Sequence, residues 1–94
     1  MGEVKREELS DSKGRYVYAS DAGQAEMTFS KAGDSLIIID HTDVSDGLRG
    51  KGIGAKLVAQ AVSDAREGHY KILPLCPFAA KTFRDHPEWA DIKS

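Results

Sequence analysis

Residues 48–55 read Leu-Arg-Gly-Lys-Gly-Ile-Gly-Ala and stand between an apolar run and a segment with helical periodicity. A glycine-rich turn at the start of a helix points several unpaired backbone N–H groups in one direction, at the positive end of the helix dipole. Glycine also lets the backbone approach a ligand closely and adopt a positive φ. Arg49 and Lys51 add positive charge at the same place. The stretch therefore predicts a site for an anionic group, above all a diphosphate.

The glycine spacing distinguishes this turn from two common phosphate-binding motifs. A Walker loop ends in Gly-Lys-Ser/Thr, whereas Gly52 is followed by Ile53. A dinucleotide fingerprint has Gly or Ala three positions after its second glycine, and Ala55 satisfies that requirement. The acidic ribose-binding residue after a second strand is missing, which weakens this alternative without removing it. A plain strand-to-helix turn, with glycines for close packing, also stays open.

The pattern Arg-x-x-Gly-x-Gly, formed by Arg49, Gly52 and Gly54, resembles the acetyl-coenzyme A loop of the GNAT superfamily of N-acetyltransferases. Two flanking stretches strengthen the resemblance, His-Thr-Asp-Val at 41–44 and Pro-Leu-Cys-Pro-Phe at 74–78. Together they are similar to the small, single-domain GNAT-like family. The similarity covers most of residues 40–89.

Hydrophobic periodicity predicts the elements around this turn. Strands are expected at 15–19, 24–31, 36–44 and 70–75, and helices at 53–67 and 78–85. The last strand is expected to run parallel to the third, because a crossover helix separates them. The predicted fold class is α+β, in the order β-β-β-α-β-α. With the resemblance, this is a GNAT-like minimal fold: a mostly antiparallel sheet with one central parallel β-α-β pair. Residues 1–94 are interpreted as a single acetyl-CoA-binding domain with a loosely ordered start at 1–13.

Two parallel strands place their carboxyl ends side by side, and ligands of such sheets usually bind in the crevice outside those ends. Here the crevice would be lined by residues 42–44, 49–54 and 75–78. The resemblance implies that backbone groups of residues 41–44 pair with the pantetheine arm and that the diphosphate lies on residues 49–54. The predicted cofactor-binding residues are Thr42, Asp43, Val44, Arg49, Gly50, Lys51, Gly52, Ile53 and Gly54.

The lone cysteine, Cys76, falls at the mouth of the same crevice and is a catalytic candidate. It would accept the acetyl group covalently or donate a proton to the coenzyme A sulfur, and the alternative is a small buried apolar side chain. His41 is the second candidate, placed to orient or deprotonate a nucleophile; the alternative is a buried histidine bonded to the backbone. Adding Asp40 and Asp43 to these two residues gives no metal-ligand spacing, so no metal is expected.

Three cations on the predicted helices are candidates for the 3′-phosphate of coenzyme A: Lys56, Lys81 and Arg84. Solvated helix faces are the simpler interpretation of all three. His69 and His86 are interpreted as surface turn residues.

The acceptor is less well marked than the cofactor. A full-length GNAT enzyme usually has helices between its first two strands, and many members carry a tyrosine acid on the last helix. Here the corresponding turn is only 20–23, and residues 78–85 contain no tyrosine. The predicted function is an acetyl-CoA-dependent N-acetyltransferase acting on an unidentified amine of a small molecule or a protein, with a partner chain able to complete the acceptor site. The alternatives are a non-catalytic coenzyme A or acyl-CoA binding module, serving as sensor or carrier, and an interaction domain without ligand.

Composition sets the outer limits. The formal net charge of −2 gives no basic excess, so no nucleic acid partner is expected. No apolar run approaches the ~20 residues of a membrane span, so no membrane association is expected either. A single cysteine cannot form an internal disulfide, which favours the cytoplasm.

Overall fold

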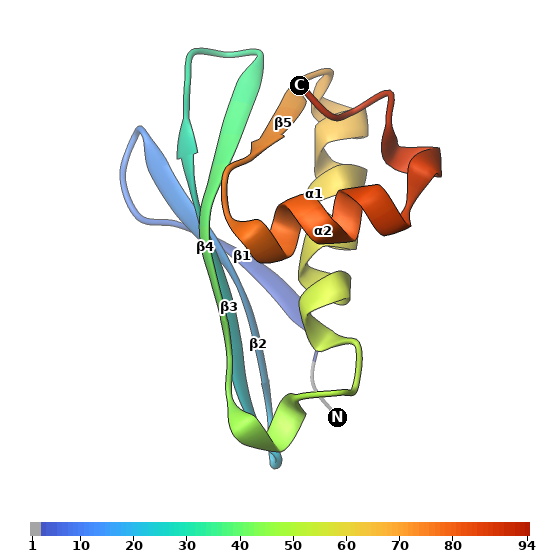
Figure 1. Ribbon diagram of the computed structural model, residues 1–94. Coiled ribbons are helices and arrows are strands. Elements are labelled where there is room, and N and C mark those ends of the chain that lie inside the picture. Colours follow the sequence, from blue (N-terminus) through green and yellow to red (C-terminus); the bar gives the residue numbers. More distant parts are fainter. Residues whose placement is uncertain (1–2) are drawn as a thin grey trace.

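A twisted sheet forms one layer of the structure, and helices cover one of its faces (Figure 1). The structure is a computed structural model that describes residues 3–94. Within that range the strands are β1 (Val4–Glu8), β2 (Lys13–Ser20), β3 (Gly23–Lys31), β4 (Leu36–Val44) and β5 (Lys71–Pro74). The α-helices are α1 (Ile53–Gly68) and α2 (Pro77–Asp85), and the short 3-10 turns are η1 (Asp46–Leu48) and η2 (Pro87–Trp89).

The strands follow one another across the sheet in the order β1-β2-β3-β4-β5. All neighbouring pairs are antiparallel except β4 and β5, which pair in parallel from Leu36↔Lys71 to Ile39↔Pro74. The expected α+β class, the mostly antiparallel sheet and the parallel crossover around α1 are therefore confirmed. The parallel pair lies at one edge of this sheet rather than at its centre, because β5 is the last strand in the order.

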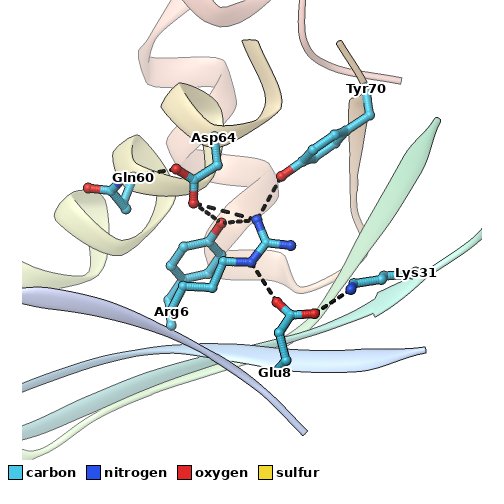
Figure 2. Close-up of polar contacts among 7 residues, drawn as sticks. Arg6, Glu8, Lys31, Gln60, Asp64 and Tyr70 are labelled. Atoms are coloured by element: carbon cyan, nitrogen blue, oxygen red, sulfur yellow. Dashed lines mark hydrogen bonds and ion pairs between the residues drawn. The ribbon is translucent and has the colours of Figure 1, made fainter. Parts of the chain in front are cut away.

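The expectation of a loosely ordered start is wrong for residues 4–8, which form the edge strand β1, and it lies outside the described residues for 1–2. Arg6 attaches this charged strand to the body of the molecule (Figure 2). Its Nη1 donates to the hydroxyls of Tyr16 (3.2 Å) and Tyr70 (2.9 Å) and lies 3.5 Å from Oδ2 of Asp64. These partners come from β2, from α1 and from the residue before β5, so no local pattern in the sequence could reveal them.

Helix α1 supplies one side of the hydrophobic core. The apolar residues that give the predicted helix its periodicity are buried: Ile53, Leu57, Val58, Ala61, Val62 and Ala65. It packs against the large apolar side chains on one face of the sheet: Tyr16, Met27, Phe29, Ile37, Ile39 and Ile72. Burial and the hydrogen bond to Asp64 raise the pKa of the Tyr16 hydroxyl, which therefore stays neutral in the folded protein.

The C-terminal end of α1 is formed by Gly68 and His69. Gly68 is the last helical residue, and His69 takes the left-handed conformation with φ 59°. The reason for glycine at 68 is the ring of Tyr70, since an added Cβ would lie 2.6 Å from its Cε2.

Among residues 3–94 no helix is long and apolar enough to cross a membrane.

Candidate functional site

The two parallel strands separate after a short paired region. Pairing of β4 with β5 ends at Ile39↔Pro74, whereas β4 itself continues to Val44. At the point of separation the N–H groups of Leu75 and Cys76 both donate to the carbonyl oxygen of Ile39, at 3.2 and 3.1 Å. The rest of β4 therefore has an edge that β5 does not cover, and this edge adjoins the helices (Figure 1).

A β-bulge decides which β4 side chains face the helices. The β3 residue Phe29 pairs with Ile39 and Thr28 pairs with His41, which leaves Asp40 as the extra residue. Beyond the bulge, Thr42 lies opposite the buried Met27, on the helix-covered face of the sheet. The side chain of His41, the expected second catalytic residue, is consequently exposed on the opposite face.

Backbone groups of β4 also alternate between its two edges. The N–H of Ser45 donates to the carbonyl of Gln24 on β3 at 2.9 Å. By alternation, Asp43 directs its backbone groups to β3, and Thr42 and Val44 direct theirs to the uncovered edge. This edge therefore carries backbone donors and acceptors able to pair with an extended ligand.

The phosphate loop (residues 49–54) leads into α1 without a side-chain cap. Gly50 and Gly52 have φ of 77° and 74°, a left-handed conformation that favours glycine. A Cβ added at either glycine would have no atom within 4 Å, so the space above the loop is open. Gly52 is the N-cap, and its carbonyl accepts the N–H of Lys56 at 3.1 Å. The preceding N–H groups at the start of α1 have no intrahelical acceptor, as at any helix N-terminus.

Of the two loop cations, only Arg49 belongs to the pocket lining. Its Nε lies 3.5 Å from the carbonyl oxygen of Val44 and 3.3 Å from Oδ1 of Asp46, and its side chain is 71% exposed. The guanidinium therefore contacts the end of β4 and is still exposed enough to bind an anion. Lys51 is exposed and does not line the pocket.

A pocket of about 500 Å³ lies between the end of β4, the phosphate loop and α2. It is lined by Thr42, Asp43, Val44, Leu48, Arg49, Gly50, Gly52, Ile53, Gly54, Ala55, Phe78, Lys81, Thr82, Asp85 and His86. All the predicted cofactor-binding residues except Lys51 thus border one space. Its wall depends on Gly54, because a Cβ there would lie 2.4 Å from the ring atom Cζ of Phe78.

Cys76 lies behind this lining rather than in it. It is the N-cap residue of α2 and only 5% exposed. Its Sγ donates to Oγ1 of Thr42 at 3.4 Å, and Thr42 does line the pocket. The thiol is thus one side chain away from the space that the phosphate loop borders.

Helix α2 adds further residues to the pocket, of which Phe78 was expected in the crevice and Lys81 was a phosphate candidate, whereas Thr82 and Asp85 were not singled out from the sequence. Phe78, Thr82, Asp85 and His86 line it from α2 and its C-cap, with Lys81 between them. The signal available was their spacing of three and four residues, which places side chains on one helix face. His86, expected at the surface, is half-buried and stacks on Trp89 with ring centroids 4.1 Å apart.

Within residues 3–94 no group of three His, Cys, Asp or Glu side chains could hold a metal ion.

Comparison with known proteins shows which family this chain belongs to. The family model for GCN5-related N-acetyl-transferase matches residues 15–92, so the chain belongs to the GCN5-related N-acetyltransferase family. The solution structure of a GCN5-like putative N-acetyltransferase from Staphylococcus aureus is similar at 33% identity and a TM-score of 0.71. That likeness covers 98% of this chain and 87% of the other.

A second, more distant likeness concerns the fold alone. The crystal structure of ribosomal-protein-alanine N-acetyltransferase from Brucella melitensis biovar Abortus 2308 has a TM-score of 0.69 at 19% identity. It covers 82% of this chain and 62% of that longer chain. A search of curated proteins finds no match to this sequence.

Proposed function

We propose that this protein is an acetyl-CoA-dependent N-acetyltransferase that acts on an amine. One observation carries the proposal: the unpaired N–H groups at the start of α1 and the uncovered backbone edge of β4 border the same pocket. The first suits a diphosphate, and the second suits an extended amide-containing chain. Coenzyme A contains both in sequence, which matches the arrangement from the phosphate loop to Thr42.

The phosphate loop fits this ligand on steric grounds as well. The positions where Gly50 and Gly52 would carry a Cβ are open, which leaves room for phosphate oxygens close to the backbone. Arg49 supplies a guanidinium, a group suited to phosphate binding, and Asp46 is its nearest acidic partner. We assign the diphosphate to residues 49–54 and the pantetheine arm to 42–44.

When bound, acetyl-CoA supplies an activated acetyl group as a thioester. Attack by the acceptor amine puts negative charge on the carbonyl oxygen, and a backbone N–H on the uncovered edge of β4 is positioned to stabilise it. Donors already in place for such a charge are each worth about 3 kcal/mol of barrier reduction. We assign this role to the N–H groups of Thr42 and Val44, which strand alternation directs toward the pocket.

Cys76 is assigned the role of proton donor to the departing thiolate. The amine forms a bond to the carbonyl carbon, the C–S bond breaks, and the coenzyme A sulfur takes a proton from the Thr42 hydroxyl, which the Cys76 thiol replaces. Solvent then carries the extra proton of the acylated nitrogen back to Cys76, which leaves a neutral amide. The geometry favours this over a covalent acetyl-cysteine, because the base expected to activate the thiol, His41, lies on the opposite face of the sheet.

A coenzyme A binding module without turnover is the second candidate. Two observations favour it: α2 contains no tyrosine, and the Cys76 thiol is only 5% exposed.

We propose the cytoplasm as the compartment, since the one cysteine is a free thiol.

The test is release of free coenzyme A thiol from acetyl-CoA in the presence of amine acceptors. A panel that contains a polyamine, a lysine peptide and a peptide with a free N-terminus covers small-molecule and protein amines. Amine-dependent thiol release that exceeds the protein-free rate supports the enzyme. Saturable binding of acetyl-CoA with no release for any amine supports the binding module instead.

A further inference from the structure

The pocket beside α2 has two chemically different ends. Its wall on α2 is formed by Phe78, Lys81, Thr82 and Asp85, followed by the C-cap residue His86. Over the nine residues of α2, this wall extends roughly 13 Å along the helix axis. The N-terminal end of α2 adjoins Thr42 through Cys76, whereas Lys81, at the middle of the helix, pairs with Asp85, its last residue.

Few cations reach this pocket. Within residues 3–94, Arg49 and Lys81 are the lysine or arginine side chains that line it. Lys56 and Arg84, which the sequence also offered as phosphate ligands, do not belong to the lining. Because Arg49 lies at the phosphate loop, Lys81 is the remaining cation for a second anionic group on the same ligand.

We propose that Lys81 binds the 3′-phosphate of coenzyme A and makes the protein prefer coenzyme A over its 3′-dephospho form. The assignment rests on the proposed function. If the thioester lies by Cys76 and the diphosphate on residues 49–54, the adenosine end falls toward the C-terminal half of α2. A phosphate monoester there brings about 1.5 to 2 negative charges, more than a carboxylate carries.

Asp85 limits this preference. Lys81 Nζ lies 3.2 Å from Asp85 Oδ2, and the two side chains are 69% and 59% exposed. Exposed pairs of this kind are weak, and lysine four residues before the acid is the less favourable order on a helix. The phosphate therefore replaces Asp85 as the partner of Lys81. The nearby carboxylate repels the phosphate, so its removal strengthens binding of coenzyme A.

The experiment is calorimetric titration of coenzyme A and 3′-dephospho-coenzyme A at low ionic strength, where charge interactions are least screened. We expect wild type to bind coenzyme A about threefold to fivefold more tightly than the dephospho form, the range of one exposed charge contact. Lys81→Gln should abolish this ratio and leave the dephospho affinity unchanged. Asp85→Asn should increase the ratio, and Lys56→Gln, the matched control on α1, should preserve it.

Two results overturn the assignment while leaving the proposed function intact. One is an unchanged ratio in Lys81→Gln, whether or not Lys56→Gln loses it; the other is equal binding of coenzyme A and its dephospho form by wild type. If wild type binds neither ligand, the proposed function fails, and the role of Lys81 fails with it. Thermal denaturation of each variant shows whether it is folded during the titration.

Discussion

The thiol of Cys76 donates to the hydroxyl oxygen of Thr42 across 3.4 Å, connecting the first residue before α2 with the uncovered part of β4. This contact spans the place where the two parallel strands separate. It puts the one cysteine of the chain beside the pocket without exposing it, since Cys76 is only 5% exposed.

A thiol that protonates the leaving group is needed for turnover but not for cofactor binding. We expect Cys76→Ala to lower kcat by about 100-fold, the lower end of general acid contributions, with little change in acetyl-CoA affinity. Cys76→Ser should keep part of the rate, because a hydroxyl can still donate. The measurements are thiol release and calorimetric affinity. Intact mass after incubation with acetyl-CoA distinguishes the two mechanisms. An acetyl adduct that forms on wild type but not on Cys76→Ala would contradict proton donation and support covalent transfer.

The open space above Gly52 predicts a binding defect that exceeds the stability defect. Gly52→Ala should cost about 1 kcal/mol of unfolding free energy, because φ is 74°, and should weaken coenzyme A binding about tenfold or more by placing a methyl group where phosphate oxygens approach. Gly33→Ala is a matched control, since Gly33 has φ 75°, an equally open Cβ position and no place in the pocket lining.

Chemical denaturation and titration of both variants give the comparison. Equal affinity in Gly52→Ala and Gly33→Ala would mean that the diphosphate does not lie on this loop.

Gly54 keeps the ring of Phe78 against α1. Gly54→Ala would place a Cβ 2.4 Å from Cζ of that ring. Phe78 is 39% exposed, so the ring is expected to swing into the pocket with a loss of stability of about 1 kcal/mol, the low end of overpacking costs. Coenzyme A affinity should fall, and adding Phe78→Leu should recover it by removing the far ring atoms. A double variant that binds no better than Gly54→Ala alone would argue against the ring as the obstacle.

The Glu8 carboxylate predicts a pH dependence of stability. Lys31 first, and then Arg6, hold its pKa below the ordinary value of 4.5. A depressed pKa in the folded state contributes stability above that value, and the contribution is lost as pH falls through the folded pKa. Glu8→Gln should therefore lower the thermal midpoint at pH 7 and approach wild type in strong acid. Glu3→Gln, the same change just before β1, serves as the control; a parallel shift at all pH values would contradict the prediction.

The sequence predicted the parts of this fold that local patterns specify. Alternation predicted β3, helical periodicity predicted α1, and the glycine spacing predicted the turn that leads into it at 49–54, because each pattern depends on residues close together in the chain. Strand β1 was not predicted because its sequence is charged and lacks apolar alternation. The contact of Arg6 with Tyr70, which attaches this strand, joins residues 64 positions apart. The placement of His41 failed for a different reason. The bulge at Asp40 shifts the alternation of side chains by one residue, so His41 faces away from the helices. The side-chain pattern of the sequence does not indicate this bulge.

The most direct test of cofactor binding is titration of the labelled protein with coenzyme A, followed through backbone amide shifts. We expect the largest changes at Gly50, Gly52, Gly54 and Thr42. The amides of the Arg6–Asp64 cluster (Arg6, Tyr16, Asp64 and Tyr70), which lies outside the pocket, should not change. Absence of changes at the phosphate loop, or changes centred on the Arg6–Asp64 cluster instead, would contradict the proposed site.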